Sequence, residues 1–259
     1  TLTGYTAGTV TINPALITLT PTQAIKVYDT TQGVSGATTT PTITVTSGTL
    51  YTNAATNLTD AVSGGVFTYD TAAAGSNKTL SLSGVGILNG STNASANYTI
   101  SYGTNTTSVI NKAPITISGL TVSNKVYDTN TTATVVATSA TAAGVLPGDT
   151  VTVSGTATGV FASANAGSGI AVTPTLTSLV LSNPNYTITD VTTPLTANIT
   201  QATVTLTASK PYDGNTTFAT TNGSATFTVT TGISGQALTI SGSATANDAN
   251  VVGVSCLLY

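Results

Sequence analysis

Aliphatic residues alternate with threonine or serine in many short runs along the chain. Examples are "ITLT" from Ile17, "LSLSG" from Leu80, "TVTVSG" from Thr150 and "TFTVT" from Thr226. A period of two places the aliphatic side chains on one face of an extended strand and the hydroxyl groups on the other, so these runs predict half-buried β-strands. No window holds apolar residues at a sustained helical spacing. Glycine, asparagine and proline cluster about every ten residues, as turns between short strands require. The pattern predicts an all-β fold.

Four kinds of sequence marker recur along the chain. The tetrad Lys-x-Tyr-Asp begins at Lys26, Lys125 and Lys210, and a similar strand pattern precedes each copy: "INPALITLT", "INKAPITIS" and "ITQATVTLT". The units end with "NYTISY" from Asn97 and "NYTITD" from Asn185, and small-residue segments lie between these markers. Recurrence of this kind indicates a repeat protein. We predict a closing strand of a preceding or neighbouring unit at 1–12, β repeats at 13–111 and 112–200, and an incomplete β repeat at 201–259.

The length of each whole repeat is that of a small sandwich domain. We therefore expect tandem antiparallel β-sandwich domains of the Ig-like type, arranged as beads on a string. The ragged ends suggest a further hypothesis, in which residues 1–13 of one subunit add as a strand to the incomplete third repeat of the next. The alternative is an arbitrary cut through a longer repeat protein.

The tetrads predict a strand end followed by a turn. In an extended strand Lys26 and Tyr28 point to one face and Asp29 to the other. Aspartate accepts a hydrogen bond from the backbone two residues on, and tyrosine supplies core bulk that is scarce here. A glycine follows the aspartate only in the third copy, so the turn geometry is a point at which the copies can differ. The predicted structural motif consists of Lys26, Tyr28, Asp29, Lys125, Tyr127, Asp128, Lys210, Tyr212 and Asp213.

Composition limits the chemistry of the chain. Its 259 residues include five lysines but no arginine, eight aspartates but no glutamate, and no histidine, methionine or tryptophan. Without histidine, neither a Ser-His-Asp nor a Cys-His arrangement is available, so we expect no catalytic residues. The formal net charge of −3 gives no electrostatic footprint for nucleic acid. No apolar run approaches the roughly 18 residues that span a bilayer, so we expect no membrane insertion.

Other candidate sites favour plain structural roles. For calcium, the dense oxygen-bearing stretches are "YDGNTT" from Tyr212 and "NDAN" from Asn247, but neither matches an EF-hand loop, and we expect no metal or cofactor. The tetrad lysines are candidates for isopeptide bonds to asparagine, although an ordinary salt bridge is favoured. Cys256 has no partner for an internal disulfide. The scarcity of residues open to oxidation and tryptic cleavage favours an extracellular location.

The segments "KVYDTT", "KVYDTN" and "KPYDGNTT", together with "NYTIT", resemble the YDG-type repeats of large bacterial surface proteins, including filamentous-haemagglutinin-like adhesins. The resemblance covers nearly the whole chain. It implies secreted, tandem β-domains that serve as a stalk or fibre in adhesion or biofilm, without catalytic residues. The expected partners are neighbouring copies, flanking repeats of the same chain, and host or matrix glycans. The competing hypothesis is a surface module that binds a glycan or ice.

Overall fold

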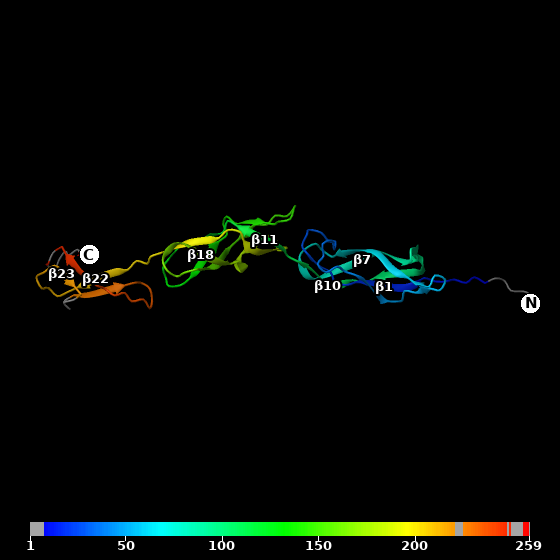
Figure 1. Ribbon diagram of the computed structural model, residues 1–259, viewed down its shortest axis with the longest axis horizontal. Helices are drawn as coiled ribbons and strands as arrows, with labels where there is room; N and C mark the ends of the chain where they lie inside the picture. The colour runs from blue at the N-terminus through cyan, green and yellow to red at the C-terminus, as the bar shows by residue number, and fades with distance from the viewer. Residues whose placement is uncertain (1–7, 221–224, 248, 250–255, 259) are drawn as a thin grey trace, which may run out of the picture. The chain divides into compact units, whose positions relative to one another are not determined.

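The computed structural model describes residues 8–220, 225–247, 249 and 256–258 (Figure 1). Of residues 256–258 only the backbone is described. Over these ranges the chain is all-β, as predicted, with two single-turn 3-10 helices, η1 (Ser95–Asn97) and η2 (Leu176–Ser178). None of the helices described is long and apolar enough to cross a membrane. The contacts divide the chain into two compact units. One comprises Thr1–Ser118, Ala140–Ser154 and Val180–Thr192, and the other comprises Gly119–Ser139, Gly155–Leu179 and Thr193–Tyr259.

Repeat 1 contains two main sheets. The first has the strand order β3 (Ile43–Ser47), β1 (Ala15–Pro21), β9 (Tyr98–Tyr102). The second has the order β2 (Ile25–Val27), β10 (Asn105–Asn111), β7 (Gly75–Asn89), β6 (Ala61–Tyr69), with β8 (Thr92–Asn93) paired to β7. A short hairpin joins β4 (Thr52–Asn53) and β5 (Leu58–Thr59).

The two sheets of repeat 1 share an aliphatic core. Ile17 and Leu19 of β1 pack in one cluster with Leu82 and Ile87 of β7. The intervening Thr18 is only partly buried, so the alternation of aliphatic and hydroxyl residues separates core from surface as predicted. Burying one such aliphatic side chain contributes about 2 kcal/mol to folding. This core holds β1, and therefore the start of the repeat, against the longest strand.

The other sheets fall into two groups. With repeat 1 lie a sheet of order β15 (Thr141–Ala143), β11 (Ala113–Ser118), β20 (Tyr186–Val191), and the pair β16 (Val153–Ser154) and β19 (Val180–Leu181). The second unit holds a six-stranded sheet of order β12 (Thr121–Val122), β14 (Thr132–Val136), β17 (Thr156–Phe161), β18 (Gly167–Thr175), β21 (Leu195–Thr200), β13 (Lys125–Val126). It also holds the third repeat, with β22 (Thr205–Ser209) paired to β24 (Thr226–Thr230), and the order β23 (Thr217–Ala219), β25 (Ser243–Ala246), β26 (Cys256–Leu258).

The sheets are mixed, which corrects the expectation of purely antiparallel pairing. In repeat 1, β1 pairs with β9 in parallel and β2 pairs with β10 in parallel. Repeat 2 has the same two arrangements, β11 with β20 and β13 with β21. The tetrad strands β2 and β13 thus run alongside β10 and β21, which precede the next repeat. Alternation could not predict this, because its period of two is the same in parallel and antiparallel strands.

Strand β22 of the third repeat has a single neighbour, β24, within the described part of the chain, whereas β1 and β11 each have two. The parallel strand that β9 and β20 supply in the whole repeats has no counterpart among the described residues of the third repeat. The side of β22 opposite β24 is therefore open in the described structure.

The N-terminal segment is not a strand where it is described. Residues 1–7 of the predicted closing strand at 1–12 lie outside the described residues, and residues 8–14 carry no strand pairing. Val10 and Ile12 are 90% and 92% exposed. The residue at the matching sequence position before β11, Ile110, is 1% exposed. The segment thus carries aliphatic side chains like those before β11, but its residues 8–14 pair with no described strand.

Candidate functional site

The first tetrad holds a buried ammonium group. Lys26 is 1% exposed, and its Nζ donates to Asp29 Oδ1 at 2.6 Å, to the Thr31 carbonyl at 2.7 Å and to the Gly33 carbonyl at 2.8 Å. It also lies 5.6 Å from the centre of the Tyr69 ring. A buried charge is tolerated only when it is paired and hydrogen-bonded, and here each of the three N–H donors of the ammonium group has an acceptor. We call the tetrad lysine, its aspartate and the acceptors in the following loop the lysine clasp.

The same clasp forms in the other two tetrads. Lys125 Nζ donates to Asp128 at 2.6 Å and to the carbonyl and side chain of Asn130 at 2.7 and 2.9 Å. Lys210 Nζ donates to Asp213 at 2.7 Å and to both oxygens of Asn215 at 2.9 Å. Each ammonium again lies within 6 Å of an aromatic ring, at 5.8 Å from Phe161 and 5.2 Å from Phe218. In all three repeats, therefore, the lysine ammonium group fixes the loop after the tetrad through the same set of hydrogen bonds.

The aspartate points back to its own lysine, so its predicted orientation toward the opposite face is wrong. Strand β2 ends at Val27, and the chain beyond it is no longer extended. The predicted turn is present: the Thr31 amide donates to Asp29 Oδ1 at 2.9 Å, two residues on. Lys26 and Tyr28 point to one side, as predicted, and are 1% and 7% exposed, whereas Val27 is 39% exposed.

The three clasps stabilise the ionised form of their aspartates. Burial acts most strongly on Asp29 and raises its pKa, but hydrogen bonds from Lys26 and Thr31 outweigh it and hold the pKa below its usual value. In the other two clasps, the hydrogen bond from the lysine is the largest cause and lowers the pKa of Asp128 and Asp213. At neutral pH each clasp is an ion pair.

The turn has one geometry in all three copies, contrary to the expectation that the residue after aspartate could change it. Thr30 and Thr129 have φ values of 70°, and Gly214 has a φ of 74°. A β-branched residue rarely adopts this left-handed conformation, which costs roughly 1–3 kcal/mol. The clasp therefore imposes the backbone conformation in the first two copies, and only the third copy has the residue that adopts it without strain.

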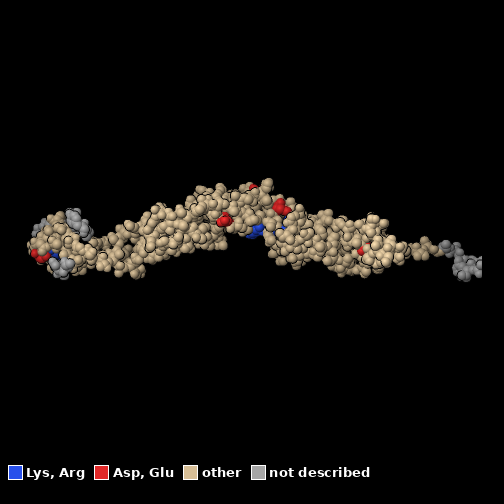
Figure 2. Space-filling view, in the orientation of Figure 1, with Lys and Arg blue, Asp and Glu red and all other residues tan. Residues whose placement is uncertain are grey.

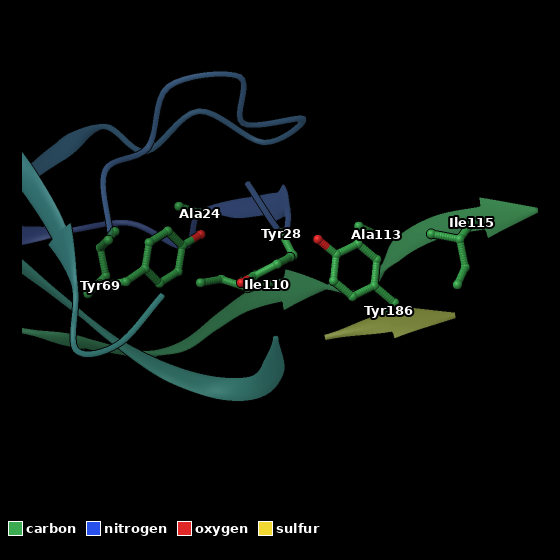
Figure 3. Packing of buried hydrophobic residues seen from close by; sticks show 8 residues of the cluster. Ala24, Tyr28, Tyr69, Ile110, Ala113, Ile115 and Tyr186 are labelled. Atoms are coloured by element: carbon green, nitrogen blue, oxygen red, sulfur yellow. The ribbon is translucent and has the colours of Figure 1, made fainter. Parts of the chain in front are cut away.

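The tetrad tyrosine contacts both its own repeat and the one that follows. The Tyr28 amide donates to the Asn111 carbonyl at 2.8 Å, and the Tyr127 amide donates to the Thr200 carbonyl at 2.8 Å. Each tyrosine is thereby attached to the closing strand of its own repeat. The ring of Tyr28 lies in a hydrophobic cluster that includes Ala113, Ile115 and Tyr186, beyond the predicted boundary at 111 (Figure 3).

Within this cluster, two tyrosines share one carboxylate oxygen. Tyr28 and Tyr186 both donate their hydroxyl groups to Asp149 Oδ2, at 2.9 and 2.7 Å. Their rings meet edge to face, with centroids 5.6 Å apart. Burial, followed by the hydrogen bond to Asp149, raises the pKa of each tyrosine, so both remain hydrogen-bond donors at neutral pH. We call Asp149 and Tyr186 the socket of repeat 2, and Tyr28 its plug.

Tyr127 makes the corresponding contact to the third repeat. Gln236 Nε2 donates to the Tyr127 hydroxyl at 2.9 Å. Gln236 and Asp149 occupy the same place in their repeats, because "GQALTISG" from Gly235 matches "GDTVTVSG" from Gly148. The tetrad tyrosine of one repeat therefore hydrogen-bonds the same sequence position of the next repeat in both cases, Tyr28 with Asp149 and Tyr127 with Gln236.

Sequence reasoning missed the socket residues. It gave no role to either aspartate, whereas Asp149 is a shared acceptor and Asp60 is 8% exposed. Asp60 Oδ2 accepts from Tyr98 at 2.7 Å, so repeat 1 has the same aspartate and tyrosine pair. The available signal was the Val-Ser-Gly run that follows both aspartates.

The remaining candidates gain no chemical role. Among the described residues, no three His, Cys, Asp or Glu side chains gather as metal ligands do. The "NDAN" stretch and the side chain of Cys256 lie partly or wholly outside them. In the lysine clasps, a lysine to asparagine bond would need a neutral amine and a protonated acid, but the lowered pKa of Asp128 favours the ion pair. Figure 2 shows only scattered charged side chains on the visible face.

A family model described as the YDG domain matches the chain twice, over residues 13–107 and 111–194. The first match contains the tetrad at Lys26, and the second contains the tetrad at Lys125. The comparison with curated proteins gives no match. The comparison with solved structures gives none either.

The left-handed turn predicts a stabilising substitution. Thr129→Gly removes the strain of a β-branched residue at φ 70°, and after the greater freedom of glycine in the unfolded chain is subtracted, we expect a gain of about 1 kcal/mol. Gly214→Thr should destabilise the third repeat by a similar amount. Thr132→Gly, at the exposed first residue of β14, is the control and should destabilise. Denaturant unfolding measures all three; a loss of stability in Thr129→Gly contradicts the account.

The clasps also predict acid sensitivity. An aspartate whose pKa is lowered on folding contributes stability that is present above its unfolded pKa of about 3.9 and is lost as the pH falls through the lower folded value. The three clasp aspartates are of this kind, and so is Asp70, which is paired with Lys78. We expect the Tm, followed by circular dichroism, to change little between about pH 7 and about pH 5 and to fall steeply below about pH 4. A Tm that is constant down to about pH 2 would be incompatible with this electrostatic role.

Proposed function

Because the chain belongs to the YDG domain family, we propose that it is a non-catalytic, load-bearing segment of a secreted bacterial surface protein, such as the stalk of an adhesin or an extracellular fibre. In this proposal the repeats are tandem Ig-like sandwich domains, their partners are neighbouring copies or flanking repeats, and their location is the cell surface or biofilm matrix. The family membership supports the repeat character, and the mechanical role rests on the strand pairing described next.

The parallel pairing of tetrad strand and closing strand carries the proposal. β2 lies near the start of repeat 1 and β10 is its last strand, with Ile25 opposite Val109 and Val27 opposite Asn111. A force pulling the two ends of the repeat apart would act along this parallel pair and load its hydrogen bonds together. Bonds loaded together resist more force than bonds opened one by one. The same pairing recurs in repeat 2, where Lys125 lies opposite Ile199.

The lysine clasp supports the same role. It lies directly after the tetrad strand and ties that strand to the loop that follows, through the bonds of Lys26 to the Thr31 and Gly33 carbonyls. The tyrosine amide bonded to the closing strand extends the loaded pair by one residue. A clasp of this kind keeps the short tetrad strand from peeling away under load.

Surface composition agrees with exposure to an extracellular medium. Exposed faces carry cross-strand hydroxyl pairs, such as Thr20 with Thr46 at 2.9 Å and Ser118 with Thr141 at 2.8 Å. Hydroxyl pairs keep their strength in high salt, whereas exposed ion pairs are screened.

Strand addition is the proposed mode of polymerisation. The open side of β22 and the exposed Val10 and Ile12 are complementary features, one lacking a strand and the other lacking a sheet. An added strand gains main-chain hydrogen bonds along the whole edge. In this proposal residues 1–13 of one subunit complete the third repeat of the next.

Single-molecule force spectroscopy tests the load-bearing role. We expect two discrete unfolding peaks for repeats 1 and 2, each releasing about 300 Å of extended chain less the folded length of the repeat. Val109→Pro removes the amide that donates to the Ala24 carbonyl at 2.9 Å, so it should lower the force of one peak only. Repeat 2 in the same molecule is the control. Unfolding of both repeats at low force, without discrete peaks, would refute the mechanical proposal.

A further inference from the structure

The three clasp aspartates differ in the residue that follows each of them. Asp213 is followed by glycine, and of the eight aspartates in the sequence it is the only one with that neighbour. Asp29 and Asp128 are followed by Thr30 and Thr129. The backbone of the following residue is the same in all three copies, with φ values of 70°, 70° and 74°. The copies therefore form a matched set in which only the side chain after the aspartate changes.

The clasp folds each carboxyl group back along the chain. Asp213 Oδ1 accepts a hydrogen bond from the Asn215 amide at 3.1 Å, and Asp128 Oδ1 accepts one from the Asn130 amide at 3.1 Å. The first clasp has the same bond at 2.9 Å. A bond to the amide two residues on brings the carboxyl carbon beside the intervening amide nitrogen. The aspartate side chains are 35%, 46% and 36% exposed in the three clasps, so access of water does not distinguish them.

The residue after the aspartate decides whether that amide nitrogen is shielded. Beyond its two chain neighbours, no described atom lies within 4 Å of the position that a Cβ on Gly214 would take. Glycine also rotates freely about φ, which lets its nitrogen turn toward the carboxyl carbon. At Thr129 a β-branched side chain stands on the carbon next to the nitrogen and restricts that rotation. Attack of the nitrogen on the carboxyl group is thus unhindered at Gly214 alone among the three clasps.

We propose that Asp213 is the site of a spontaneous covalent modification, isomerisation to isoaspartate, and that Thr30 and Thr129 protect the other two clasps from it. The Gly214 nitrogen forms a bond to Cγ of the protonated aspartate while the bond from Cγ to its hydroxyl oxygen breaks. The amide proton leaves with that hydroxyl as water, which closes a succinimide ring. Water then adds to the main-chain carbonyl of the ring and breaks its bond to nitrogen, so the chain runs through Cγ. The only co-reactant is water, and no atom is oxidised or reduced.

Isomerisation would open the third clasp. The main chain gains one carbon, and the carboxylate becomes attached directly to Cα. The geometry that places Asp213 Oδ1 2.7 Å from Lys210 Nζ and 3.1 Å from the Asn215 nitrogen is then lost. The strained threonines therefore have a benefit that stability alone does not show, because they keep the first two clasps chemically durable.

The clasp also slows its own modification. The hydrogen bond from Lys210 is the largest cause that lowers the pKa of Asp213. Ring closure needs the protonated carboxyl group, and a lower pKa leaves less of that form at a given pH. Lys210→Met should therefore speed isomerisation of Asp213. An unchanged rate in this variant would overturn the protective role of the lysine.

Asn89 is an internal comparison, because it is followed by Gly90 and asparagine cyclises in the same way with loss of ammonia. Its side chain is held, however. Nδ2 donates to the Leu58 carbonyl and to Asp60 Oδ1, both at 2.8 Å, and Oδ1 accepts from Thr56 at 2.7 Å. The residue is 8% exposed. Ring closure would break all three bonds, so we expect Asn89 to stay intact in the folded chain.

Peptide mapping of the folded chain, incubated at about pH 6, tests the proposal. Electron-transfer fragmentation in a mass spectrometer distinguishes isoaspartate from aspartate. We expect isoaspartate to form at Asp213 at least about tenfold faster than at Asp128, which corresponds to a barrier lower by at least about 1.4 kcal/mol. Isomerisation leaves the peptide mass unchanged, whereas deamidation of Asn89, or of Asn222 outside the described residues, raises it.

Exchanging the following residue between clasps makes the test specific. Gly214→Thr should suppress isoaspartate at Asp213. Thr129→Gly should produce it at Asp128, in a clasp that the substitution stabilises, so unfolding would not explain the result. Thr132→Gly is the control and should leave Asp128 unmodified. Equal rates at Asp213 and Asp128 in the wild-type chain, no isoaspartate at Asp213, or an unmodified Asp128 in Thr129→Gly would each overturn the proposal.

Discussion

The ammonium group of the tetrad lysine is the interaction on which each repeat depends. It belongs to a strand of only three residues, β2, and it donates to four acceptors in the loop that follows. Because those acceptors lie three, five and seven residues beyond Lys26, in and just after the turn at Asp29, satisfying the charge fixes the loop. The left-handed threonines show how strongly it does so, since they accept backbone strain to keep the geometry that Gly214 adopts freely.

A fixed loop has a consequence for the tyrosine two residues after the lysine. Tyr28 is held by its clasp and by the Asn111 carbonyl, and its ring enters the cluster of the following repeat, where Asp149 accepts its hydroxyl. A chain with few aromatic residues thus uses tyrosine at the joints, where a ring adds buried area and a hydroxyl gives direction. The clasp belongs to one repeat, and the contact it positions belongs to the next.

Much of the fold was predictable because it depends on neighbours in sequence. The alternation from Ile17 to Thr20 indicated a half-buried strand, and the tetrads indicated a turn after aspartate. The parallel pairing was not predictable, because the same alternation serves both strand directions. The contact of Tyr28 with Asp149 joins residues 121 positions apart, and only the repeated Val-Ser-Gly runs hinted at equivalent aspartates. The left-handed Thr30 was missed because threonine rarely adopts that conformation.

Replacing the buried lysine tests the central claim most directly. Lys26→Met keeps the length and apolar stem of the side chain but leaves Asp29 and the Thr31 and Gly33 carbonyls without their donor, which should cost about 2 kcal/mol. Hydrogen exchange of the Tyr28 and Val109 amides reports on repeat 1 separately. The account predicts exchange about 30-fold faster in Lys26→Met, with no change in the exposed control Lys112→Met. Equal exchange rates in the two variants would contradict it.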